Sequence, residues 1–189
     1  MRLTSKRMIM ALAAVVLLGT GSILASPSAP SPDSSAYLSE RASTLLAEIQ
    51  KETGELRLHT DTLGTFAWNP QYSWQSHASY LDRVKGHLNA VGERIAKLQH
   101  IRHFVLPWQQ QAITEVTSHA AQVAASTQAA IVHLRENQNR LFVAEYRDHL
   151  TTIADRAGDL KETVDKFLDY EEAQQRFERL KGELEVKGT

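Results

Sequence analysis

The chain has 189 residues, a formal net charge of −1 and no cysteine. The absence of cysteine excludes disulfides, thiolate metal sites and covalent c-type haem attachment. No basic patch stands out, which excludes nucleic acid as a partner, and the length predicts one folded domain behind any targeting segment.

Residues 1–25 have the composition of a secretory signal peptide. A basic start is followed by an uninterrupted apolar run over residues 8–18, and cleavage is predicted after Ala25. The alternative is an uncleaved N-terminal anchor in the inner membrane, because residues 8–25 carry no charge. Both interpretations export the rest of the chain to the periplasm or the extracellular space, since basic residues stay on the cytoplasmic side. Loss of the three basic residues would change the net charge from −1 to −4.

Residues 26–35 contain three prolines and no large apolar side chain, which predicts an extended Pro/Ser-rich linker. A first helix is expected over residues 36–63, where apolar side chains recur on one stripe. Gly64 is expected to end this helix, and Gly54 to weaken its middle by about 1 kcal/mol relative to alanine.

An aromatic-rich connection follows between Gly64 and Ser76. It contains Trp68, Tyr72 and Trp74 around a predicted Asn-Pro turn. Two interpretations stay open: an aromatic plug that seals one end of a helical bundle, or a loop that grips a ligand.

Residues 74–105 carry the longest apolar stripe of the chain, at alternating steps of four and three residues. A stripe of this length needs other helices to cover it. Pro107 suits a first helical turn, so a third helix is predicted over residues 107–136 immediately after the second. A fourth helix, over residues 140–170, repeats the same spacing from Tyr146 to Phe167.

These helices are each about 30 residues, or roughly 45 Å, long. Matched lengths and short connections predict an all-α fold, an antiparallel up-down-up-down four-helix bundle over residues 36–170. Residues 171–189 are rich in charge and carry a thin apolar stripe of Phe177, Leu180 and Leu184. They are expected to form a charged C-terminal helical tail, and self-association through residues 171–186 is one interpretation of that stripe.

Eight histidines are the unusual chemical resource of the chain. Residues equally distant from a hairpin turn lie at the same height, so several imidazoles and carboxylates are expected at one end of the bundle. Imidazole and carboxylate together suit Zn²⁺ or another divalent metal ion. The candidate ligand or metal site consists of His59, His77, His133, Asp61 and Glu136, with Trp68, Tyr72 and Trp74 in the adjoining loop. The competing interpretation is that these histidines are structural residues of helix interfaces.

Haem is an alternative ligand, for which the chain offers a restricted choice of axial ligands. All three methionines lie in residues 1–25, so removal of that segment leaves only a bis-His arrangement of axial ligands. The Glu-x-x-His pairs of di-metal carboxylate bundles are missing, because Glu115 and Glu145 precede His119 and His149 by four residues, not three.

Catalytic motifs are absent from the sequence. There is no glycine-rich phosphate loop, no Gly-x-Ser-x-Gly and no His-Glu-x-x-His, so we expect no enzyme and assign no catalytic residue. The favoured function is an exported helical bundle that binds an envelope protein or a small ligand. The alternative is a bundle that binds a metal ion, or haem through two histidines.

Overall fold

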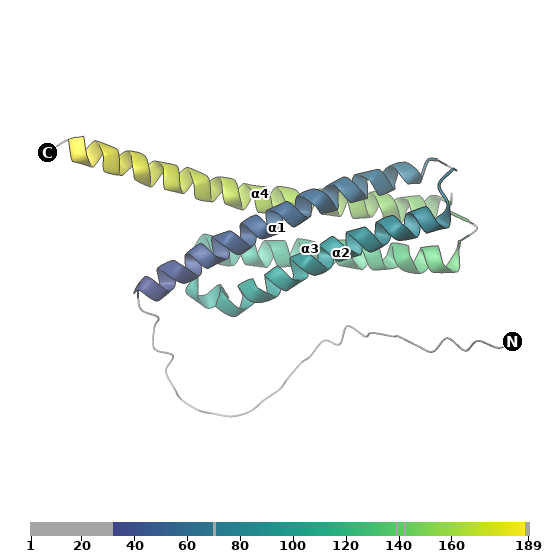
Figure 1. Ribbon diagram of the computed structural model, residues 1–189, viewed down its shortest axis with the longest axis horizontal. Helices are drawn as coiled ribbons and strands as arrows, with labels where there is room; N and C mark the ends of the chain where they lie inside the picture. The colour runs from purple at the N-terminus through teal and green to yellow at the C-terminus, as the bar shows by residue number, and fades with distance from the viewer. Residues whose placement is uncertain (1–31, 70, 139, 142, 188–189) are drawn as a thin grey trace, which may run out of the picture.

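The computed structural model describes residues 32–69, 71–138, 140–141 and 143–187, and within them the protein is helical with no strand. In chain order its elements are α1 (Pro32–Phe66), α2 (Trp74–Ile101), the short 3-10 helix η1 (Arg102–Phe104), α3 (Pro107–Glu136) and α4 (Ala144–Lys187). Figure 1 shows the four α-helices lying side by side over most of their length. The predicted all-α, four-helix architecture is confirmed.

The four α-helices surround one hydrophobic core. α1 contacts α2 and α4, and α3 contacts α4 and α2, whereas α1 and α3 touch at very few positions. The largest fully buried side chains are Leu45, Leu46, Ile49, Leu56, Leu63, Leu81, Leu98, Ile113, Tyr146, Leu150, Ile153 and Leu160. Burying each leucine or isoleucine contributes about 1.5 to 3 kcal/mol, so these interior stripes hold the helices together.

The stripe predicted for the second helix faces this core. Leu81, Val91 and Leu98 of α2 are buried. Leu88, which lies mid-stripe, is only partly buried, and Trp74 at the start is 37 % exposed. A stripe with a seven-residue repeat drifts around a straight helix by about 20° per heptad, so a run of this length does not keep every member inside.

α1 extends beyond its predicted residue range at both ends. It begins at Pro32, inside the predicted linker, because proline fits a first helical turn and Asp33 there favours the positive end of the helix dipole. It also runs past Gly64 to Phe66 without a break at Gly54. Phe66 is buried, so its packing outweighs the tendency of glycine to end a helix.

The start of α3 at Pro107 is as predicted. Two residues later, the buried Gln109 side chain accepts a hydrogen bond from the Leu106 amide at 3.0 Å. Its amide nitrogen donates to the Ser39 carbonyl at 2.8 Å and to the Ser43 hydroxyl at 3.0 Å. The Ser43 hydroxyl in turn donates to the Glu171 carboxylate. This hydrogen-bonded chain joins α3, α1 and α4 at the point where the last part of α4 begins.

α4 has two parts with different surroundings. Its predicted stripe is buried at every position, namely Tyr146, Leu150, Ile153, Ala157, Leu160, Val164 and Phe167. Beyond Glu171, every residue as far as Glu185 is exposed, and Figure 1 shows this end of α4 continuing past the other helices. The helix begins at Ala144, four residues later than predicted.

Residues 1–31, which include the predicted signal peptide and most of the predicted linker, lie outside the described residues. Among the helices that are described, none combines the length and the apolar character needed to cross a membrane.

Candidate metal centre

Tyr146 lies at the centre of the histidine-rich end. It is fully buried in α4, and its hydroxyl lies 3.2 Å from Nδ1 of His77, which is fully buried in α2. The ring of His133, in the last turn of α3, stacks on the Tyr146 ring with a centroid separation of 5.2 Å and an interplanar angle of 19°. One phenol therefore connects imidazoles from two other helices.

Burial sets the protonation of this pair. Burial lowers the pKa of His77 and raises the pKa of Tyr146. The imidazole is therefore neutral at pH 7 and the phenol keeps its proton, so one hydrogen bond joins the Tyr146 hydroxyl and Nδ1 of His77, and its direction depends on the tautomer of the imidazole. The other ring nitrogen, Nε2, is buried and has no hydrogen-bond partner among the described residues.

A second group of polar side chains lies beside Tyr146, on the surface between α3 and α4. His133, Glu145 and His149 each offer one ligand atom, and these atoms lie within 4.8 Å of one another. Nδ1 of His133 is 4.0 Å from the Glu145 carboxylate, and the rings of His133 and His149 are 5.5 Å apart. Nε2 of His133 is buried without a hydrogen-bond partner in the described part of the chain. These three side chains and Glu136 line a common hollow.

Local helix geometry explains why these side chains meet. Glu145 and His149 are four residues apart on α4, so they share one face, one turn from each other. His133 faces them from the last turn of α3, where its stacking on Tyr146 fixes the ring. Glu145 is 75 % exposed, so it is free to move and leaves the hollow open to water. The hollow therefore holds two imidazoles in fixed positions and one carboxylate that can move.

This ligand set has a definite chemistry. Two imidazoles and one carboxylate match the protein ligands of many Zn²⁺ sites, in which a water molecule completes the coordination. With bonds of about 2.1 Å, the ligand atoms of a tetrahedral centre lie roughly 3.4 Å apart. The present spread of up to 4.8 Å is therefore wider than an occupied site requires. Glu145 is exposed, so its carboxylate can move towards the two imidazoles.

The sequence-predicted site residues are divided among three places. His133 and Glu136 line the hollow between α3 and α4. His77 is one ring away, behind Tyr146. His59 lies elsewhere at the same end, with its ring 5.2 Å from that of His87, and Asp61 forms an exposed ion pair with Arg57 at 2.8 Å. The five predicted ligands are therefore not brought to one point.

The neighbours of His59 form ion pairs with one another between α1 and α2. His87 Nδ1 lies 2.9 Å from the Glu52 carboxylate, and Arg94 pairs with Glu52 at 3.5 Å and with Glu48 at 3.0 Å. Partial burial, followed by the nearby His87 and Arg83, lowers the pKa of His59. These contacts fit a structural interface between α1 and α2.

The predicted loop aromatics behave differently from one another. Tyr72 stacks on the buried Phe66 with a centroid separation of 3.8 Å, as an aromatic plug requires. Trp68 is 72 % exposed, with the Arg147 guanidinium 4.8 Å from its ring. Trp74 lines a separate hollow between α2 and α3. None of the three lines the hollow that holds His133 and Glu145.

The predicted set of ligands does not contain Glu145, His149 or Tyr146. The spacing of four residues between Glu145 and His149 argues only against a Glu-x-x-His pair, because it also places two side chains on one face of a helix. Tyr146 was assigned to the core stripe, which is where it lies. No sequence pattern indicates that two histidines stack against it.

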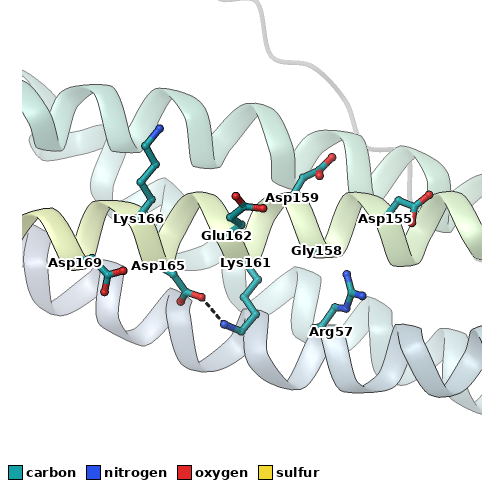
Figure 2. A pocket seen from close by; sticks show the side chains of 9 residues that line it. All are labelled: Arg57, Asp155, Gly158, Asp159, Lys161, Glu162, Asp165, Lys166 and Asp169. Atoms are coloured by element: carbon teal, nitrogen blue, oxygen red, sulfur yellow. Dashed lines mark hydrogen bonds and ion pairs between the residues drawn. The ribbon is translucent and has the colours of Figure 1, made fainter.

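A groove between α1 and α4 is also lined by polar side chains, of which Lys161 and Asp165 pair with each other within α4 (Figure 2). Arg57 crosses α4 at Gly158, where an added Cβ would lie 2.1 Å from the guanidinium, and it donates to the Ala154 carbonyl at 3.1 Å. Burial alone would raise the pKa of Asp165, but hydrogen bonds from Lys161 and Gln50 lower it overall. Arg57 and Asp165 of this groove thus contribute contacts between α1 and α4.

No protein-family model, curated protein or solved structure matches this chain. The function proposed below is therefore inferred from the geometry of the site.

Proposed function

We propose that this protein is an exported helical bundle that works by binding, and that it binds a divalent transition-metal ion through His133, Glu145 and His149. The observation that carries this proposal is the convergence of three ligand atoms within 4.8 Å, one of them on a histidine held in place by stacking.

The ligand types select the class of metal. Imidazole favours Zn²⁺, Cu²⁺ and Ni²⁺, whereas Mg²⁺ and Ca²⁺ favour sites built from oxygen. We propose binding in preference to catalysis because the hollow is open to solvent and would not shield a reacting group from water. Haem has less support: its macrocycle would have to lie between two axial imidazoles, and the rings of His133 and His149 are close together, edge to face.

Export is proposed from the basic start and apolar run of residues 1–25. The periplasm or the extracellular space is then the site of action, with the inner membrane as an anchor if the segment is retained. The predicted partner, an envelope protein or a small ligand, would meet the metal at the open side of the hollow. N-terminal sequencing of the protein from fractionated cells tests this point, and recovery of an intact N-terminus from the cytoplasm would contradict it.

The antiparallel up-down-up-down order of the bundle is also a proposal. It is supported by the contacts between α1 and α4. Ser43 pairs with Glu171, Gln50 with Asp165 at 2.9 Å, and Arg57 with the Ala154 carbonyl at 3.1 Å. Residue numbers rise along α1 as they fall along α4, as expected for oppositely directed neighbours. The exposure of residues 172–185 supports the charged C-terminal extension in the same way.

Calorimetric titration of Zn²⁺ into the purified protein tests the metal site. The wild type should bind one ion, and a His133→Ala/His149→Ala variant should bind more than about tenfold more weakly, since the loss of a good ligand costs at least 1.4 kcal/mol. A His59→Ala/His87→Ala variant is the matched control, because it removes two imidazoles from the same end but none from the hollow. Binding should also weaken as the pH falls through about 6 to 7, where histidine takes up a proton.

The two double variants separate the competing interpretations. Equal affinity in both, or a larger loss in the His59/His87 control, would contradict the assignment to His133 and His149. Absorption of the Co²⁺-loaded protein provides a second measurement, because tetrahedral Co²⁺ absorbs strongly in the visible region and the signal should disappear in the His133/His149 variant alone.

A further inference from the structure

The end of α4 carries an apolar stripe in the open. Tyr170, Ala173, Phe177, Leu180 and Leu184 follow one another at steps of three, four, three and four residues, which places them on one face of the helix. Phe177 is 64 % exposed, Leu180 50 % and Leu184 72 %. We call residues 170–187 the α4 tail. Tyr170, at its start, packs against Trp108 of α3, whereas Phe177, Leu180 and Leu184 are exposed.

The tail stripe is not a continuation of the buried stripe. The buried stripe ends with Val164 and Phe167, and the next member of an alternating pattern would be Glu171. The apolar residues instead come one position earlier, at Tyr170 and Ala173. One residue corresponds to about 100° of rotation in an α-helix, so the tail stripe is turned by that angle from the face that packs against the bundle. From Phe177 onwards this face is exposed.

A groove adjoins this stripe where the tail leaves the bundle. Leu106 and Trp108 at the start of α3 and Tyr170, Ala173 and Phe177 of the tail line it. The rings of Trp108 and Tyr170 meet at 5.8 Å and an angle of 66°. Because Ala173 is small, it leaves a depression between the two larger tail residues on either side of it. The groove can therefore receive a large apolar side chain.

We propose that a second copy of this chain covers the tail, and that the two tails pair in opposite directions. Such a pairing brings Phe177 against Leu180 of the partner subunit, and Ala173 against Leu184 of the partner subunit. By symmetry each contact is made twice. The large partner leucine meets the small alanine next to the groove, so the stripe is complementary to itself in this direction. A two-fold contact of this kind closes on itself and gives a dimer.

Charge decides the direction of pairing. In a heptad that begins at Tyr170, Arg176 and Glu183 occupy the same flanking position, and Lys181 lies on the other flank. All three are exposed. In oppositely directed tails, Arg176 lies beside Glu183 of the partner subunit, and the pair occurs twice. In tails running the same way, Arg176 would lie beside Lys181 of the partner subunit, which is repulsive. The sequence of charges therefore favours the opposite direction.

The bundle also prepares the tail for pairing. An isolated helix of this length is marginal in water, but the tail is continuous with the buried part of α4. Glu171, at its start, accepts a hydrogen bond from Ser43. The tail is therefore already helical before a second copy arrives, which lowers the entropy lost on binding. This proposal does not depend on the metal site, which uses the other end of the molecule.

Sedimentation equilibrium over a range of protein concentrations tests the dimer, with single and paired charge reversals as variants. The wild type should form a reversible dimer. Arg176→Glu alone and Glu183→Arg alone should each shift the protein towards monomer by at least about tenfold in dissociation constant, because each places like charges together. The Arg176→Glu/Glu183→Arg double variant should recover the dimer. Arg179→Glu, an exposed change away from the stripe, is the control and should leave the dissociation constant unchanged.

Each other outcome overturns the proposal. A stronger dimer in Arg176→Glu would mean that the tails run in the same direction, since the new glutamate would then pair with Lys181 of the partner subunit. A wild type that stays monomeric at all concentrations would show that a second copy does not cover the stripe. An equal loss in Arg179→Glu and Arg176→Glu would show a general charge effect. Circular dichroism of every variant verifies that the bundle is folded.

Discussion

The two parts of α4 form a natural comparison, because they belong to one uninterrupted helix and carry the same three-and-four spacing. Leu150 in the first part is 1 % exposed, whereas Leu184 in the second is 72 % exposed. The difference lies in the neighbours: α1 and α3 lie against the first part, and no described helix lies against the second. Periodicity thus identifies an apolar face, but it does not identify the surface that covers it.

The largest expected difference between the two parts comes from the same leucine-to-alanine substitution in each. Leu150→Ala should lower the free energy of unfolding by about 2 to 5 kcal/mol, because it leaves a cavity in the core. Leu184→Ala should change it by no more than about 0.5 kcal/mol at a protein concentration where the chain is monomeric. Urea denaturation followed by circular dichroism measures both, and similar values would show that the tail is packed against the body.

Two tyrosines of α4 provide the next comparison. Tyr146→Phe removes the hydroxyl that bonds to His77, leaves a second buried ring nitrogen unpaired and should cost about 1 to 3 kcal/mol. Tyr170→Phe removes a hydroxyl that accepts from Gln174 at 2.7 Å on the surface, where water replaces it. That variant should unfold at the same urea concentration as the wild type. A neutral Tyr146→Phe would mean that its contact with His77 does not stabilise the bundle.

Acid should affect the body and not the tail, because none of the eight histidines lies beyond His149. The pKa of the buried His77 is lowered in the folded protein, so the unfolded chain binds the proton first. Stability is therefore full above about pH 6.5 and declines as the pH falls below it, by at most about 1.4 kcal/mol per pH unit for one group. Urea midpoints between pH 8 and 5.5 should show this slope, and His77→Gln should reduce it.

Removal of the tail should have the smallest effect on folding. A chain that ends at Glu172 keeps the Glu171 contact with Ser43, and its unfolding free energy should lie within about 0.5 kcal/mol of the wild type when both are monomeric. The same chain should lose the concentration-dependent dimer. A large loss of helicity or of cooperative melting in the body would show that the tail takes part in its folding.

The helices could be predicted from the sequence because their stripes are long and regular. Pro107 marks the start of α3, and the residues from Tyr146 to Phe167 mark the buried face of α4. The candidate site was predicted less well. Distance from a turn fixes the height of a residue along a bundle, but not the direction in which its helix is rotated. His59 and His77 therefore lie at the same end, yet one faces His87 and the other faces Tyr146.

Some contacts could not be predicted because they depend on side chains that meet from distant parts of the chain. Gln109 reads in the sequence as an ordinary first-turn residue, although its side chain bonds to α1. The same applies to the proximity of His133 and His149, which requires two helices to be placed before two imidazoles can be compared. Helix ends were predicted to within four residues, and the errors at α1 arise from proline and from the packing of Phe66.

The chain of hydrogen bonds from Gln109 through Ser43 to Glu171 has a consequence for the shape of the assembly. It fixes the point at which α4 leaves the body, so the tail projects in one direction as a rigid helix. In the proposed dimer, two such tails paired in opposite directions would give a long rod with a body at each end. The proposed metal centres would then occupy the two outer tips. A particle of that form would sediment more slowly than a sphere of equal mass.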